Sequence, residues 1–242
     1  LLPGGHRWAV VDATRSGLRG ITTAYNAVRY SGIAGNASGY RSIIAQPSDI
    51  VVFLHDDVHL LPNFELSIYE QVDRLSSSPE HASTWCGIGM ATVCADAGPA
   101  DPKFRGYWLD FGMVPFNKPM AESVQEARLV PDEAMLVTLR GSVGQFTEAL
   151  KEFHCYGPDF ALSCLAAGKF IHPTDTFICG HKTWHTDGRL TVHGRDFAAW
   201  TKGVDMTELR RAGKFLADTW KHKVDLRPVR TTACRIDKTD LP

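Results

Sequence analysis

The chain has 242 residues, of which 44% are hydrophobic and 22% charged, proportions that are ordinary for one globular domain or one domain with an appendage. The formal net charge of -1 provides no basic field, so nucleic acid is excluded as an expected partner. No apolar run approaches the length of a membrane span.

The first residues and the cysteines bear on the cellular compartment. Leu1 and Leu2 are followed by Pro-Gly-Gly, which is not a signal peptide, and there is no initiator Met, as in a fragment or a processed chain. The six cysteines form no C-x-x-C pair, which favours free thiols in a reducing compartment, although an even number also permits disulfides. We therefore expect a cytoplasmic protein, unless targeting information has been lost with the N-terminus.

Apolar patterns predict the secondary structure in chain order. Strands are expected over residues 8–11, 30–34, 50–54, 85–93, 107–114, 129–139, 170–172 and 176–179, and the region 129–139 is expected to be interrupted at residues 131–133. Helices are expected over residues 21–28, 36–45, 61–75, 146–153, 160–167, 197–202 and 206–221. The helix over 61–75 repeats Phe64, Ile68, Val72 and Leu75 at helical spacing, so this face is expected to pack on the sheet.

Residues 50–57 are the most informative stretch. The apolar run over 50–54 predicts a strand buried on both faces, and it ends abruptly in His55, Asp56 and Asp57. A parallel strand delivers such residues to the carboxyl edge of a sheet, where open α/β folds bind ligands. Imidazole and carboxylate groups there suit a divalent cation such as Mn²⁺ or Mg²⁺. The competing interpretation is that these Asp residues cap a helix or turn the chain.

The sequence F-L-H-D-D-V, preceded by Ser-Asp and followed by Leu-Pro-X-Phe, resembles the metal-binding motif of GT-A glycosyltransferases. Within them it is most similar to the family-2-like branch written F-[VL]-H-X-D-V. The resemblance implies an α/β fold of the GT-A type, with a mixed, mainly parallel sheet flanked by helices. It places the catalytic domain in residues 1–190 and a helical extension, packed on the core, in residues 191–242. We also expect the C-terminal helices to offer a surface for a homo-oligomer.

The resemblance implies a set of metal ligands. Asp57 is the main candidate ligand of Mn²⁺ or Mg²⁺. In many GT-A enzymes a C-terminal histidine completes the metal shell, and His185, in Trp-His-x-x-Gly, matches that position better than His181. The alternative for both histidines is a surface or packing role.

The resemblance also implies contacts with the nucleotide. The loop after the first strand meets the base and ribose in such enzymes, which makes Asp12 and Arg15 candidates for binding the donor. Asp56 or His55 would hold the ribose or a metal-bound water. The alternative for Asp12 is a helix cap or a turn residue.

The acceptor side rests on a looser likeness. The segment Y-G-P-D-F-A-L resembles the Glu-Asp-x-x-Leu segment of the family, in which the Asp is the general base, and Asp159 is the matching residue. Pro158 replaces the acidic residue before it, and a later Arg of the family is absent. The alternative for Asp159 is capping of the helix. Asp132 and Glu133 are further candidates for the acceptor site, with solvated turn carboxylates as the alternative.

The resulting hypothesis is a metal-dependent, inverting glycosyltransferase. It would move a sugar from a nucleoside-diphosphate sugar to a hydroxyl of a glycan or another acceptor. Two other classes stay open. A nucleotidyltransferase uses similar metal and diphosphate chemistry, and residues 16–20, S-G-L-R-G, match its glycine-rich loop weakly. A catalytically inactive nucleotide- or glycan-binding module is the other alternative, and Pro158 is its best support.

Overall fold

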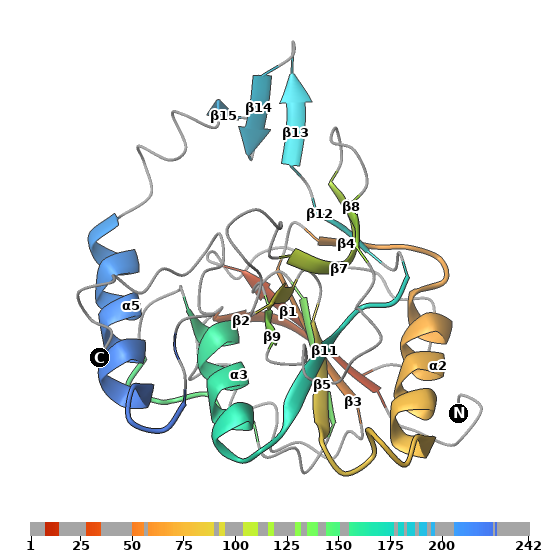
Figure 1. The fold of residues 1–242 in the computed structure, drawn as a ribbon. Helices are drawn as coiled ribbons and strands as arrows, with labels where there is room; N and C mark the ends of the chain where they lie inside the picture. The colour runs from red at the N-terminus through yellow and green to blue at the C-terminus, as the bar shows by residue number, and fades with distance from the viewer. Residues whose placement is uncertain are drawn as a thin grey trace.

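The computed structural model describes residues 8–14, 28–34, 50–55, 58–89, 92–94, 104–110, 116–118, 129–131, 135–139, 144–150, 155–176, 179–181, 183–186, 189–192, 195–196, 206–224 and 226. Side chains are described for residues 50–54, 58, 60–89, 135–139, 144–150, 155–176, 207–224 and 226. Helices α2 (Phe64–Ser77), α3 (Tyr156–Ala166) and α5 (Met206–Trp220) lie within these ranges (Figure 1).

The main sheet is mixed, as expected, and has the strand order β11-β5-β10-β3-β1-β2. Its strands are β1 (Trp8–Thr14), β2 (Val28–Ala34), β3 (Ile50–His55), β5 (Trp85–Gly89), β10 (Met135–Leu139) and β11 (Phe170–Pro173). The pairings β3–β1, β1–β2 and β11–β5 are parallel, whereas β10 is antiparallel to both of its neighbours. The part formed by β11, β5, β10 and β3 is therefore mostly antiparallel, whereas three of the five pairings of the whole sheet are parallel. The reason is that β10 enters the sheet at the edge where β3 ends.

Two smaller sheets account for the remaining strands. The order β4-β12-β7-β6-β9 defines the second sheet, with β8 paired to β7, and β13, β14 and β15 form the third. The strands are β4 (Val58–Leu60), β6 (Thr92–Cys94), β7 (Phe104–Asp110), β8 (Phe116–Lys118), β9 (Leu129–Pro131), β12 (Cys179–His181), β13 (Thr183–Thr186), β14 (Arg189–Val192) and β15 (Arg195–Asp196). The predicted strands over 85–93 and 129–139 are each divided between the main and the second sheet, because the chain crosses from one sheet to the other.

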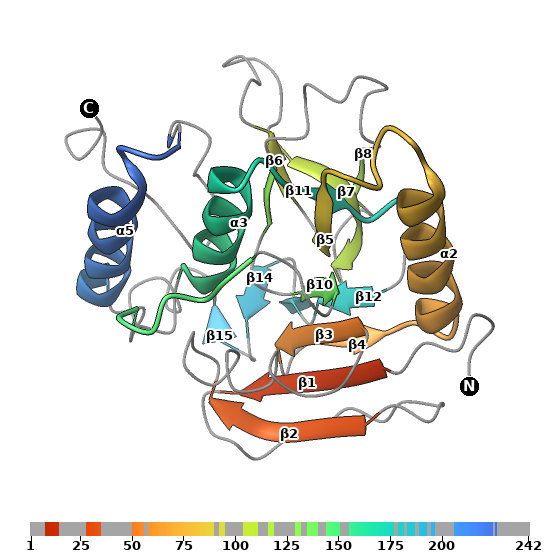
Figure 2. The ribbon, with the colours of Figure 1, turned by 90° about the horizontal axis from the view of Figure 1, so that it is seen from below.

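Strand β3 forms the centre of the core. Its side chains alternate between two hydrophobic clusters, and residues 50–54 are all at most 1% exposed, so the predicted burial on both faces is confirmed. On one face, which we call the α2 side, the cluster includes all four predicted apolar residues of α2. On the other face, the α3–α5 side, α3 and α5 share one cluster (Figure 2).

Helix α3 is longer than predicted, and the helix expected before it is not seen. α3 begins four residues before the expected start at Phe160 and ends at Ala166, and Gly168, with a φ of 70°, lets the chain turn after it as predicted. In the predicted helix over 146–153, the described residues 146–150 are not helical. The backbone N–H of Thr147 donates to the Asp159 carboxylate, and any Cβ at Gly144 would lie 2.2 Å from the Phe160 ring. Contacts with α3 thus replace local helical hydrogen bonds.

The C-terminal part combines a helix with strands. The predicted helix over 206–221 is confirmed as α5, whereas the helices predicted over 21–28, 36–45 and 197–202 lie outside the described residues, apart from residue 28, which begins β2. The expected boundary between residues 190 and 191 falls inside β14. The buried side chains of α5 are Leu209, Ala212, Leu216, Ala217 and Trp220.

Candidate functional site

The candidate residues Asp12 and His55 lie near one edge of the main sheet. In the register of β1 and β3, Asp12 pairs with Leu54 and Ala13 pairs with His55. Asp12 therefore lies within β1 and not in the loop after it, because β1 remains paired as far as Thr14. The register of β1 with β2 shifts directly after Asp12, and such bulges are frequent next to active sites.

Strand β10 enters the sheet at the same edge. Its first residue, Met135, pairs with Leu54, which directly precedes His55. Asp132 and Glu133 lie just before β10 in the chain and are themselves outside the described residues, as are Arg15, Asp56 and Asp57. Of the described residues, the start of β10 and the end of β3 therefore lie at the same edge.

The two late histidines lie in different sheets. β12 is antiparallel to β4, and its residue His181 pairs with Val58, which directly follows Asp57 in the chain. His185 lies in β13, where it pairs with Leu190 of β14. The backbone thus brings His181 into register with the segment that adjoins Asp57, and it shows no such pairing for His185 within the described strands. The side chains of both histidines are outside the description.

Asp159 lies in the first turn of α3 and is completely buried. The turn after α3 leads into β11, which ends at Pro173 beside Gly89, so the first turn of α3 faces the same edge as the ends of β5 and β11. Asp159 does not cap α3, since the residue at the cap position is Cys155 and no side-chain cap bond forms there.

The carboxylate of Asp159 receives hydrogen bonds on both oxygens. The backbone N–H of Thr147 donates to Oδ2 over 2.6 Å, and the Thr147 hydroxyl donates to Oδ1 over 2.9 Å. The indole N–H of Trp220, at the end of α5, also donates to Oδ1 over 2.9 Å. Burial raises the pKa of Asp159, and the bonds from Thr147 and Trp220 act against that rise. The arrangement joins α3, residues 144–150 and α5 at one interior point.

The α2 side holds ionisable groups that the sequence did not single out. Glu65 is 6% exposed, its Oε2 has no hydrogen-bond partner, and burial raises its pKa. His172, on β11, is 3% exposed and contacts His81 edge to face, with ring centroids 4.9 Å apart. Burial, followed by the charges of His81 and Arg74, lowers the pKa of His172 to about 4. For Glu65 and His172, burial thus acts in favour of the neutral form.

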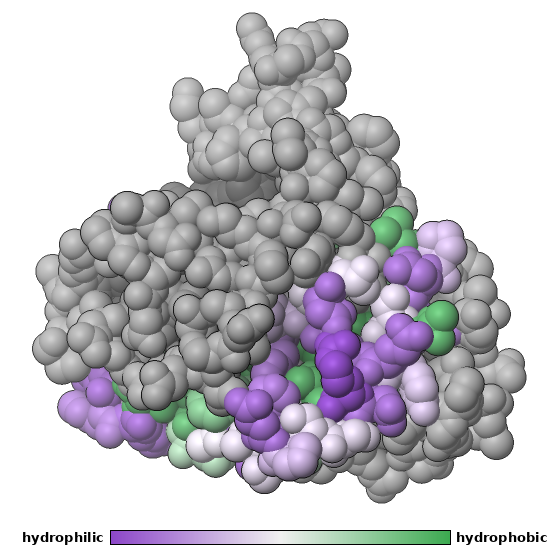
Figure 3. All heavy atoms as spheres, turned by 45° about the vertical axis from the view of Figure 1, so that its right-hand side comes forward, coloured by the Kyte–Doolittle hydropathy of each residue, from purple (hydrophilic) through white to green (hydrophobic). Residues whose placement is uncertain are grey.

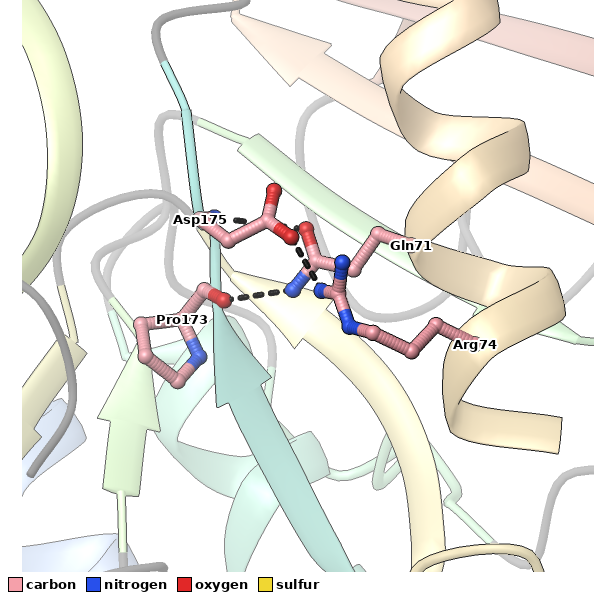
Figure 4. A network of polar contacts seen from close by, with 4 residues as sticks. All are labelled: Gln71, Arg74, Pro173 and Asp175. Carbon is pink, nitrogen blue, oxygen red and sulfur yellow. Dashed lines mark hydrogen bonds and ion pairs between the residues drawn. The ribbon is translucent and has the colours of Figure 1, made fainter. Parts of the chain in front are cut away.

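The segment at the end of β11 is held against α2 by polar contacts (Figure 4). Gln71 donates to the Pro173 carbonyl over 2.7 Å and accepts from the Asp175 N–H over 3.4 Å. The Arg74 guanidinium also forms an ion pair with the Asp175 carboxylate. Gln71 sits inside the apolar stripe of α2, so its position predicts burial, although nothing in the sequence identifies its partners.

The solvent face of α2 is mainly hydrophilic (Figure 3). Glu70, Asp73 and Arg74 are exposed there, and Leu66, at 55% exposure, is an isolated large hydrophobic residue. Within the described ranges no helix is both long and apolar enough to cross a membrane. The same ranges contain no group of three or more His, Cys, Asp and Glu side chains arranged for a metal ion, and the predicted ligands fall outside the described side chains.

Comparisons with known proteins add no relative. No protein-family model matches the chain. A search of curated proteins likewise finds no match. The motif and the strand register are therefore the observations that bear on function.

Proposed function

We propose that the protein is a metal-dependent glycosyltransferase that moves a sugar from a nucleoside-diphosphate sugar to an acceptor hydroxyl, with inversion. The observation that carries the proposal is the register at one sheet edge. There Ala13 and His55 pair across β1 and β3, and β10 begins opposite Leu54. His55 of the F-L-H-D-D-V motif therefore ends β3 where the end of β1 and the start of β10 adjoin it, which suits a ligand site at the carboxyl ends of strands.

The cation site of this proposal combines Asp57 with a late histidine. A carboxylate and a neutral imidazole form a donor set that Mn²⁺ accepts. The pairing of His181 with Val58 makes His181 the better-supported histidine, and His185 stays the alternative taken from the motif. A bound cation would supply Lewis-acid stabilisation to the diphosphate leaving group. The chain's own part is to pair β12, which carries His181, with β4, which follows Asp57 in the chain.

The nucleotide side of the proposal uses the first strand. Asp12 lies on β1 opposite Leu54, and the next residue of β1, Ala13, pairs with His55. We assign Asp12 and Arg15 to the nucleoside, and Asp56 or His55 to the ribose or to a metal-bound water. A carboxylate is suited to accept hydrogen bonds from ribose hydroxyls.

The proton acceptor has two candidates. A general base must come within hydrogen-bonding reach of the acceptor hydroxyl. Asp159 has no exposed surface, and both of its oxygens are engaged by donors within the protein. This burial favours Asp132 or Glu133, which lie shortly before β10 in the chain, over Asp159 as the residue that takes the proton.

Ligand-dependent stabilisation tests the proposal. A ligand that binds only the folded state raises the melting temperature. We expect UDP or GDP to raise it in the presence of Mn²⁺, and Asp57→Ala to abolish that rise while leaving the melting temperature of the free protein nearly unchanged. Unaltered Mn²⁺-dependent nucleotide binding by Asp57→Ala, measured by calorimetry, would count against the assignment. Comparing His181→Ala with His185→Ala in the same assay identifies the histidine.

A binding module without catalysis is the second candidate function, and the engagement of Asp159 favours it. If neither Asp159 nor the acidic pair before β10 serves as a base, nucleotide binding persists without transfer. Incubating the protein with the nucleotide sugar that stabilises it most, and following release of nucleoside diphosphate, separates the two functions. Release that depends on Asp132 or Glu133 supports the enzyme. Binding without any release supports the module.

A further inference from the structure

Two imidazole rings meet where the turn after α2 packs against β11. His172, on β11, is 3% exposed, and its ring contacts the ring of His81 edge to face, with the centroids 4.9 Å apart. His81 lies in the turn over residues 78–84 and is partly exposed, although its Nδ1 is buried and has no hydrogen-bond partner. The contact between the turn and β11 is therefore one of ring packing, without a hydrogen bond to that buried nitrogen.

The same turn carries backbone hydrogen bonds that lead into β5 and β11. The N–H groups of Thr84 and Trp85 donate to the His81 carbonyl over 2.8 and 2.9 Å. The Thr84 carbonyl accepts from the Phe170 N–H over 2.8 Å, at the start of β11. A movement of His81 away from β11 would therefore expose amide groups whose exchange with solvent can be followed one by one.

Two cationic groups act against a proton on the buried ring. Burial first, and then the charges of His81 and Arg74, lower the pKa of His172 to about 4. Arg74 is itself paired with Asp175, the acid that follows β11 (Figure 4). Like charges repel each other most strongly where water is excluded. A proton on His172 is thus opposed from the turn and from α2 together.

Within the described residues, no carboxylate raises the pKa of His172. Glu80, in the turn, is exposed, and Glu70 and Asp73 lie on the solvent face of α2. The ammonium of Lys169 donates to the Ser83 carbonyl, which adds another positive charge beside the turn. β5, the strand next to β11, contains no Asp, Glu, Lys, Arg or His. The surroundings of the two rings therefore accept the neutral pair and oppose a charged one.

We propose that His81 and His172 form an acid-sensitive latch between the turn over residues 78–84 and β11. While both rings are neutral, they pack against each other and the turn stays closed. In acid, His172 takes up a proton from water, which reaches its ring only after the turn has moved away. Acid thus favours an opened form of the turn and the adjoining start of β11. The latch does not depend on the proposed function.

The sign of the effect follows from proton linkage. In the closed form the pKa of His172 is about 4, and in the opened form, where water reaches the ring, it approaches the ordinary value of 6.5. Between these two values, protonation favours the opened form by up to about tenfold for each pH unit. The latch is therefore complete above pH 6.5, and by pH 4 the equilibrium shifts toward opening by roughly 100-fold.

Amide hydrogen exchange between pH 7 and 4, corrected for the intrinsic exchange rates, tests the latch. Protection at Thr84, Trp85 and Phe170 is expected to fall roughly 100-fold over this interval. At every pH it is expected to stay below the protection of residues 50–54, which lie in the core. Equal protection in the two regions would mean that they open only together, and would overturn a local latch. Protection that does not change with pH would overturn the acid sensitivity.

Three replacements of histidine by phenylalanine separate the latch from ordinary packing. His172→Phe keeps a buried ring without a titrating group, so the fall in protection at Thr84 is expected to disappear. His81→Phe removes one opposing charge, and the pKa of His172, followed through the NMR signal of its Cε1 proton, is expected to rise. His222→Phe, at an exposed position after α5, is the matched control and is expected to change neither quantity. An unchanged pKa of His172 in His81→Phe would overturn the coupling, and this measurement remains decisive if His172→Phe does not fold.

Discussion

Two buried acids, each in the first turn of a helix, differ in the hydrogen bonds that their carboxylates receive. Glu65 and Asp159 each lie in the first turn of a helix, on the α2 side and the α3–α5 side respectively. Asp159 receives hydrogen bonds on both oxygens, whereas Oε2 of Glu65 receives none. The same local signal, an acid near a helix start, thus leads to different environments. What decides the charge of each group is the set of donors that other segments bring to it.

The largest expected effect comes from replacing the Asp159 carboxylate by a neutral amide. Asp159→Asn places an amide NH₂ group against N–H and O–H donors that stay buried, and we expect it to lower the free energy of unfolding by about 4 kcal/mol. Urea denaturation at neutral pH measures the loss.

Glu65→Gln is the matched control for this change. It makes the same chemical replacement at an oxygen without a partner, and we expect the free energy of unfolding to change by less than about 1 kcal/mol. Similar losses in both variants would mean that the donors around Asp159 do not distinguish the two sites.

Acidification sharpens the comparison, because it acts on the two sides with opposite signs. The pKa of His172 falls to about 4 in the folded protein, below its ordinary value of 6.5. Between pH 6.5 and 4, His172 is therefore protonated in the unfolded chain but stays neutral in the folded chain. Stability from this group is complete above pH 6.5, and about 3 kcal/mol of it is lost as the pH falls to 4. Asp159, whose pKa is raised above 3.8, instead favours the folded state as it becomes protonated.

The measurement is the free energy of unfolding between pH 7.5 and 4. His172→Leu removes the titrating group, and its profile is expected to be flatter over the same interval. A profile for His172→Leu as steep as that of the unchanged protein would place the acid sensitivity elsewhere in the chain.

A smaller effect is expected when a single donor to Asp159 is removed. Trp220→Phe keeps a buried aromatic ring at the end of α5 but removes the indole N–H. A hydrogen bond to a charged group contributes about 2 kcal/mol, so the free energy of unfolding should fall by about that amount. Lys223→Met, which removes the ammonium lying 4.9 Å from the centre of the same ring, is expected to cost less because that group is exposed. A larger loss in Lys223→Met than in Trp220→Phe would contradict this reading.

Sequence patterns predicted the parts of the fold that depend on local periodicity. The apolar run over 50–54, the buried stripe of α2 and the turn at Gly168 after α3 all follow from spacing or from glycine geometry, and all are confirmed. The reversal of β10 was not predicted, because a short apolar strand reads the same in either direction. The missing helix before α3 depends on the Thr147–Asp159 bonds, which join segments that local rules treat separately.

The candidate site was predictable only where adjacent residues carry the signal. His55, Asp56 and Asp57 follow one strand, and this clustering is visible in the sequence. The preference for His181 over His185 comes from the pairing of β12 with β4, and the residues near either histidine do not predict that pairing. Trp220 falls on the apolar stripe of α5, so its burial was foreseeable, but its bond to Asp159 was not.

The insertion of β10 between β3 and β5 has a consequence for how the protein folds. β10 must pair with a strand made much earlier in synthesis, after the chain has passed through α2, β5 and the strands β6 to β9. Closing such large loops costs chain entropy before the contacts that compensate for it can form, so pairing of this kind is slow. The sheet edge that collects Asp12, His55 and the start of β10 therefore cannot exist in a nascent chain that ends before residue 139. Ligands of that edge should protect the finished protein and have no effect on its early folding intermediates.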